Sequence, residues 1–248
     1  NNPLFSIKYQ EPLMNDLPHM LMSSLSYFKR HFFRISSIIL PVLIFIGLYQ
    51  ELMMSVLQDN NSLQSLFMMA LLPNLMLVPL YQGAIIFYIA YSMDDRYLKS
   101  SQYYFLVLKM LLPCILLMLI SSIAIGFGFL LLILPGLYIT VRLSYSQIYC
   151  FIYQQSATKA FVSSWEATQD DHWLIFKGLL ITFVCSFILF FSVGFVLEGA
   201  GLNQSVSSFI TGIAASLFSI FYHVFIFRVF TANTERLDEV YTQIEQRG

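Results

Sequence analysis

Six long apolar runs dominate this chain of 248 residues. They cover residues 36–57, 66–92, 104–125, 129–153, 174–196 and 206–230. About 20 apolar residues form a helix long enough to cross the hydrocarbon core of a bilayer, and each run reaches that length. Because the runs are continuous and do not alternate with polar residues, they indicate helices and not the strands of a barrel. The sequence therefore predicts an all-α polytopic membrane bundle with six transmembrane helices.

The few charged residues predict how such a bundle is oriented. Only 11% of the residues are charged, whereas a soluble domain carries about a quarter. Basic residues occur in both ends of the chain and in the connections after the second and fourth runs. The other connections, at residues 58–65, 126–128 and 197–205, contain no Lys or Arg. Since Lys and Arg concentrate in cytoplasmic loops, we expect both termini in the cytoplasm.

The runs and their flanks divide the chain into three parts. We expect a cytoplasmic lead-in with an interfacial amphipathic helix at residues 1–34, a six-helix transmembrane domain at 35–231, and a cytoplasmic C-terminal tail at 232–248.

Two stretches outside the runs have the pattern of helices that lie in the membrane interface. In residues 17–34, apolar positions such as Leu21 and Phe28 recur at helical spacing beside Lys29 and Arg30. The alternative is a simple cytoplasmic extension of the first span. A second such helix is predicted to be capped by Ser156 and to run to about residue 168, on the cytoplasmic side.

Arg142 is the one basic residue deep inside an apolar run. A charge within a span costs at least about 2.5 kcal/mol and is usually paired or faces a cavity. Tyr side chains follow it at helical spacing, so a single helix would place five residues on one face: Tyr138, Arg142, Tyr145, Tyr149 and Tyr153. Polar partners for Arg142 are available on the second span in Asn74 and Gln82.

This face predicts a groove that holds a lipid headgroup or a partner protein. The candidate binding residues are Arg142, Tyr138, Tyr145, Tyr149 and, at the inner interface, Trp165. In the alternative interpretation, Arg142 snorkels toward the cytoplasm and the Tyr residues belong to an interfacial aromatic belt.

Motifs of known catalytic chemistry are missing from the sequence. It contains no His-Glu-x-x-His, no Gly-x-Ser-x-Gly, no phosphate-binding loop and no acidic cluster suited to a metal within a span. We therefore expect no enzyme activity, no catalytic residues, no metal and no cofactor. Basic faces interleaved with exposed aromatic residues are also missing, so we expect no nucleic-acid partner.

One segment carries a family resemblance. Pro135-Gly136 precede the Arg142 span, and a pattern of Ala-x-x-x-Ser-Trp-x-x-Thr follows at residues 160–168. This combination resembles the YciC family of six-span inner-membrane proteins of Gram-negative bacteria. Related modules form the membrane domain of some glycerophosphodiester phosphodiesterases. Asp170 and Asp171 stand here where the family usually has basic residues.

The resemblance implies a role in envelope or membrane homeostasis, in the bacterial inner membrane, and supplies no catalytic residues. With the Arg142 face, it leads us to expect a non-enzymatic, lipid-handling or scaffold protein. Membrane phospholipids are its expected partners, together with another inner-membrane or envelope lipid-transport protein. Two alternatives are a small-solute or ion transporter, and an accessory subunit that binds a partner's transmembrane helix.

Overall fold

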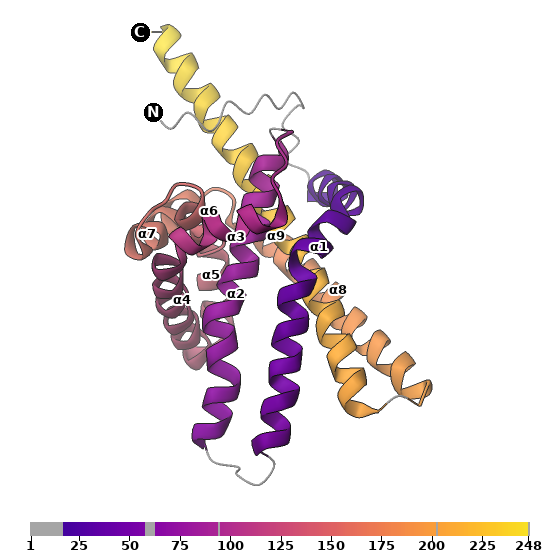
Figure 1. Ribbon diagram of the computed structural model, residues 1–248. Helices are drawn as coiled ribbons and strands as arrows, with labels where there is room; N and C mark the ends of the chain where they lie inside the picture. The colour runs from indigo at the N-terminus through magenta and orange to yellow at the C-terminus, as the bar shows by residue number, and fades with distance from the viewer. Residues whose placement is uncertain (1–16, 58–62, 94, 202, 248) are drawn as a thin grey trace.

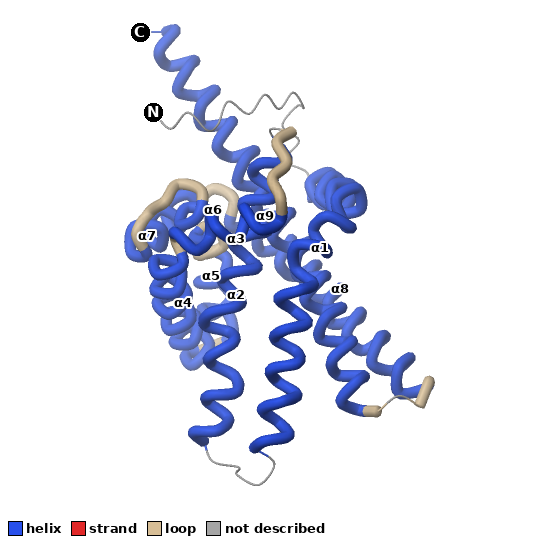
Figure 2. Tube along the Cα trace, in the orientation of Figure 1, coloured by secondary structure: helices blue, strands red, loops and turns tan. Residues whose placement is uncertain are grey.

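The computed structural model describes residues 17–57, 63–93, 95–201 and 203–247, and every regular element in these ranges is a helix (Figure 2). The helices are α1 (Leu17–Leu57), α2 (Leu63–Met93), α3 (Ser100–Lys109), α4 (Leu111–Leu131), α5 (Ile133–Arg142), α6 (Ser146–Phe151), α7 (Ala157–Ala167), α8 (His172–Gly199) and α9 (Gln204–Arg247). The all-α class predicted from the apolar runs is confirmed for the described residues.

Among the described residues, five helices contain a segment long and apolar enough to cross a membrane. These segments are Leu17–Tyr49, Leu75–Met93, Leu111–Leu131, His172–Leu197 and Phe209–Ala232. Their number indicates a multi-pass membrane protein.

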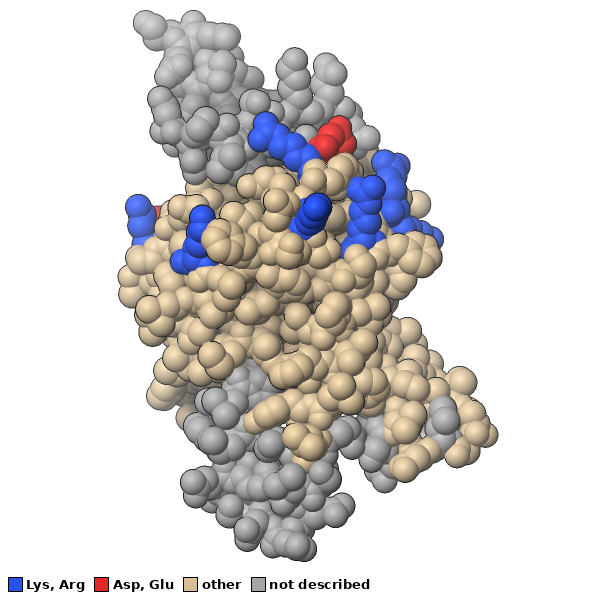
Figure 3. All heavy atoms as spheres, in the orientation of Figure 1, with Lys and Arg blue, Asp and Glu red and all other residues tan. Residues whose placement is uncertain are grey.

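The long helices run side by side in antiparallel pairs (Figure 1). α1 packs against α2 and α9, while α8 and α9 form a hairpin that diverges from α1 and α2 toward the lower right of the view. α4 and α5 form a second hairpin, and α3, α6 and α7 lie at the upper end. We call this upper end, where α1 begins and α9 ends, the basic end. On the face in Figure 3, the Lys and Arg side chains form a band across it.

Among the side chains that the structure describes, the fully buried ones concentrate toward the basic end. Fully buried side chains there include Tyr88 of α2, Tyr103 of α3, Phe151 of α6 and Phe225 of α9. In contrast, α8 carries exposed rings such as Phe195, which is 80% exposed. Such an apolar outer surface suits lipid, because lipid chains solvate apolar side chains as well as a protein interior does.

The fourth predicted span is divided in the structure. Residues 129–153 contain the end of α4, all of α5 and all of α6, with breaks at Leu132 and at residues 143–145. α5 has 10 residues, which is too short to cross a bilayer alone. The prediction of a single helix over this run is therefore wrong.

The first break lies later than the predicted connection at residues 126–128. Gly128 is inside α4, and a Cβ atom there would lie 2.8 Å from the Cα atom of Gly136 on α5. The glycines thus allow two helix backbones to approach closely and do not form the turn. The turn falls at Leu132, whose backbone is extended, and Pro135 then lies in the first turn of α5, where proline is tolerated.

The predicted domain boundaries fall inside helices. α1 continues through residues 34 and 35, and α9 continues through 231 and 232. No Gly or Pro lies at these positions, and the Ser37 hydroxyl donates to the Arg34 carbonyl oxygen within the helix. The predicted lead-in helix and the first span are thus one helix, whose first part runs at an angle to the rest (Figure 1).

Candidate functional site

Arg142 lies in a tightly packed contact between α5 and α7. Its side chain is 3% exposed, and its guanidinium carbon is 4.9 Å from the centre of the Trp165 ring and 5.8 Å from that of Tyr138. Its Nε atom is buried and has no hydrogen-bond partner among the described residues. Both aromatic rings lie close enough to stabilise the cation, an interaction that strengthens when water is excluded.

The residues of the Ser-Trp-x-x-Thr pattern stabilise the break after α5. The Ser164 hydroxyl donates to the Arg142 carbonyl oxygen at 2.8 Å and accepts the Tyr145 backbone N–H at 3.1 Å. The Thr168 hydroxyl lies 3.2 Å from the same carbonyl oxygen. A broken helix leaves backbone groups that must find other partners, and α7 supplies them here. We call this contact of Arg142, Ser164, Trp165 and Thr168 the joint.

The break also separates the predicted tyrosine face. Tyr138 stays beside Arg142, whereas Tyr145 is buried, with its ring centre 5.1 Å from that of Phe230 on α9. The half-buried Tyr149 and the exposed Tyr153 pack against the same Phe230 ring. The single helix face predicted for the five residues is therefore not formed, because residues 143–145 interrupt the helix between α5 and α6.

The predicted partners of Arg142 on α2 lie elsewhere. Gln82 accepts a hydrogen bond from Gln147 of α6 at 2.8 Å and not from Arg142. The side chain of Asn74 lies outside the described residues. Trp165 is half-buried, and its helix, α7, agrees with the extent predicted from Ser156 to about residue 168. The predicted cap is wrong, because the Ser156 side chain makes no capping hydrogen bond. Whether α7 lies in the membrane interface stays a prediction.

A different group of arginines surrounds an open cavity at the basic end. The cavity has a volume of about 950 Å³ and lies between α1, the end of α2, the segment after it and α9. We call it the basic pocket. Its polar lining consists of His19, Ser23, Ser26, Tyr27, Arg30, His31, Arg34, Ser92, Asp95, Tyr97 and Arg228.

Charge in the basic pocket favours an anion. Among the described residues that line it, Arg30 and Arg34 of α1 and Arg228 of α9 bring three guanidinium groups, against the one carboxylate of Asp95. Arg30 and Arg34 are exposed, so water and ligands can reach them. Guanidinium groups are suited to phosphate because their planar N–H donors match two phosphate oxygens at once.

Aromatic rings and hydrogen bonds hold the wall of the basic pocket in place. The Arg34 guanidinium carbon is 4.3 Å from the centre of the Tyr97 ring, and that of Arg228 is 5.5 Å from the centre of the Tyr27 ring. Tyr27 is stacked on His31, and its hydroxyl is hydrogen-bonded to the Ser92 hydroxyl. Because Ser92 donates to the Ile89 carbonyl oxygen, Tyr27 is the donor to Ser92. These contacts orient the pocket wall before any ligand binds.

Sequence reasoning missed the basic pocket, although a signal was present. His19, Ser23, Ser26, Arg30 and Arg34 are three or four residues apart, so they share one face of α1. Arg30 and Arg34 were assigned to an interfacial helix, and Arg228 was not connected with them. Only packing of α9 against α1 brings Arg228 to the same cavity.

The fold and the pocket define a multi-pass helical membrane protein with an arginine-lined cavity at one end. Comparison with protein-family models, curated proteins and solved structures finds no match to this chain.

Proposed function

We propose that this protein is a non-enzymatic integral membrane protein that binds anionic phospholipid, as a lipid-handling or scaffold component of membrane homeostasis. The observation that carries the proposal is the basic pocket, where Arg30, Arg34 and Arg228 line one cavity at the basic end. Lipid phosphates lie at this level of a bilayer, and each Lys or Arg near an anionic surface contributes about 1 kcal/mol of attraction.

The proposal includes a location in the bacterial inner membrane with both termini in the cytoplasm. The band of Lys and Arg at the basic end supports this orientation, since cytoplasmic segments are enriched in these residues. α5 and α6 together would form a sixth, broken crossing between α4 and α8. Membership of the YciC family also belongs to the proposal, and it rests on the Pro-Gly, Arg142 and Ser-Trp-x-x-Thr residues.

A small-solute transporter is the second candidate function. Such proteins bind their substrate near the bilayer midplane, often where helices are broken. A cavity with polar walls lies between α2, α4 and α9, next to the break at residues 143–145. This cavity favours a ligand near the bilayer midplane. Its described lining residues carry no Lys, Arg, Asp or Glu that would select an ion.

The anionic-lipid proposal is tested by native mass spectrometry of the full-length protein extracted from bilayers of equal phosphatidylglycerol and phosphatidylcholine. We expect retained phosphatidylglycerol on the wild-type protein. In the double variant Arg30→Gln and Arg34→Gln, its occupancy relative to phosphatidylcholine should fall by at least about fivefold, the equivalent of about 1 kcal/mol.

The control is Arg96→Gln, which removes one positive charge from an exposed residue outside the cavity lining. Its phosphatidylglycerol occupancy should equal that of the wild type. Equal occupancy in all three proteins would contradict the proposal. Displacement of the lipid by inorganic phosphate would show that the pocket binds a free anion, and a second membrane protein retained in equal amount would favour the accessory subunit.

A further inference from the structure

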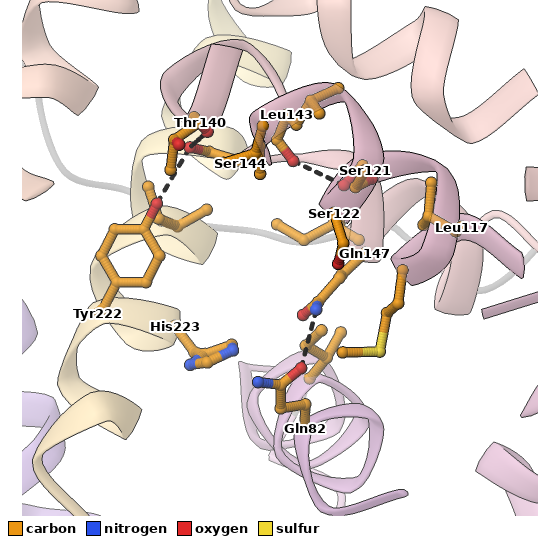
Figure 4. Close-up of a pocket in the computed structure, with 16 residues that line it drawn as sticks. Gln82, Leu117, Ser121, Ser122, Thr140, Leu143, Ser144, Gln147, Tyr222 and His223 are labelled. Carbon is orange, nitrogen blue, oxygen red and sulfur yellow. Dashed lines mark hydrogen bonds between the residues drawn. The ribbon is translucent and has the colours of Figure 1, made fainter. Parts of the chain in front are cut away.

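A second cavity, separate from the basic pocket, lies at mid-depth of the apolar spans. Its volume is about 350 Å³, and it lies between α2, α4, the α5–α6 break and α9 (Figure 4). Ser121 and His223, which line it, fall near the middle of the spans Leu111–Leu131 and Phe209–Ala232. Polar side chains at this depth are costly, so their gathering around one cavity indicates a binding site.

The cavity wall carries hydrogen-bonding groups but almost no charge. Among the described residues that line it, none is Lys, Arg, Asp or Glu. Gln147 donates to the Gln82 side-chain oxygen at 2.8 Å, and Figure 4 shows the two amides meeting from α6 and α2. This bond leaves the Gln82 N–H groups as donors and the Gln147 oxygen as an acceptor. A charged ligand would have no partner of opposite charge here.

Ser121 and His223 add two more groups that a ligand can use. The Ser121 hydroxyl is buried and has no hydrogen-bond partner among the described residues. The His223 Nδ1 atom lies 3.1 Å from the Ser219 carbonyl oxygen, which can only accept, so Nδ1 carries the proton. In the neutral ring, Nε2 is then an acceptor. The wall therefore presents hydrogen-bond donors and acceptors together. This arrangement suits a ligand hydroxyl group, which both donates and accepts.

The break between α5 and α6 forms another part of this wall. Leu143 and Ser144 belong to it and line the cavity, and the Ser144 hydroxyl is 3.0 Å from that of Tyr222. Non-helical backbone at membrane depth persists only where it is buried in protein or lines a cavity. Broken helices of this kind form substrate sites in many membrane proteins.

The ligand has access from the lipid side. Ser122 is on the cavity rim and exposed, and its neighbours Leu119 and Ile123 on α4 are exposed apolar residues. A polar rim in an apolar surface at this depth is open to lipid molecules. We propose that the cavity binds the uncharged, hydroxyl-bearing headgroup of a neutral lipid, of which diacylglycerol is the simplest example. This inference does not depend on the basic pocket or on an anionic lipid.

A photoactivatable diacylglycerol provides the test, with the full-length protein in phosphatidylcholine nanodiscs. We expect cross-links in α4 and α9, mapped by peptide mass spectrometry. Ser121→Ala removes a hydroxyl that makes no hydrogen bond in the described structure, so the fold should persist. Its cross-linking yield should fall about fivefold, as expected for one lost neutral hydrogen bond. Gln147→Leu should lower the yield further.

Ser192→Ala is the matched control, because Ser192 is exposed on α8 and does not line the cavity. Its yield should equal that of the wild type. Equal yields in Ser121→Ala and Ser192→Ala would overturn the proposal, as would equal cross-linking by a photoactivatable phosphatidylcholine. If free glycerol abolishes the cross-link, the same hydroxyl chemistry belongs to a soluble polyol, and the lipid assignment is wrong.

Discussion

Arginine occupies two contrasting environments in this protein. At the joint, Arg142 is 3% exposed and packed against Trp165, while Ser164 of α7 binds its backbone. In the basic pocket, Arg30 and Arg34 are exposed beside a cavity of about 950 Å³. The buried arginine connects helices, whereas the exposed ones remain accessible to an anion. An arginine within or beside an apolar run is therefore not by itself evidence of a binding site. Exposure and an adjoining cavity make the difference.

Disrupting the packing of α4 against α5 should give the largest loss of stability. In Gly128→Val, the new Cβ atom would meet the Gly136 backbone at 2.8 Å, so both helices must separate. We expect a loss of about 3 kcal/mol in stability, measured by reversible unfolding in SDS–detergent mixtures. Gly126→Val is the control, because a Cβ atom there meets nothing within 4 Å. Similar losses in both variants would show that this crossing is loosely packed.

The hydrogen bonds of Ser164 come next in size. Ser164→Ala removes the hydrogen-bond acceptor of the Tyr145 N–H and one of the donors to the Arg142 carbonyl oxygen. Tyr145 and Arg142 are both buried. An unsatisfied buried group costs about 2 kcal/mol, and the same unfolding measurement should detect this loss. Ser163→Ala, next to it but part-buried and bonded to Gln155, should change stability much less. The role assigned to the joint would be refuted if the two variants were equally stable.

The two arginine environments can be compared directly with one substitution. Arg142→Gln should lower stability by about 1.5 kcal/mol, because the contact with Trp165 is shielded from water. Arg34→Gln should change stability by less than about 0.5 kcal/mol, since its side chain is exposed. Lipid occupancy should show the reverse order, with phosphatidylglycerol occupancy reduced in Arg34→Gln and unchanged in Arg142→Gln. Reduced phosphatidylglycerol occupancy in both variants would show that Arg142 also contributes to lipid binding.

A change in salt concentration should produce the smallest change in lipid binding. The distance over which exposed charges interact falls from about 10 Å at 0.1 M salt to about 3 Å at 1 M. The preference of the wild type for phosphatidylglycerol over phosphatidylcholine should therefore decrease over this range. The loss of stability caused by Arg142→Gln should stay nearly constant, because Arg142 is buried. A lipid preference that does not respond to salt would argue against binding through Arg30 and Arg34. Lipid occupancy and unfolding, measured at both salt concentrations, provide the check.

Several features of the fold followed from the sequence alone. The apolar runs predicted helices long enough to span a membrane, because backbone groups in lipid must be satisfied within their own helix. Outside those runs, the helical spacing of the residues after Ser156 is a local signal and predicted the extent of α7. Arg142 and Trp165 were selected from sequence, and the structure brings them together.

Tertiary structure decided where the helices break and which arginines meet. Residues 143–145 contain no Gly or Pro, so no local signal marks the α5–α6 break, which Ser164 stabilises from another helix. Arg30 and Arg228 are far apart in the chain and share a cavity only because α9 packs on α1. Apolar periodicity fixes the local helix, whereas a pocket depends on contacts between distant residues that no single segment of sequence contains.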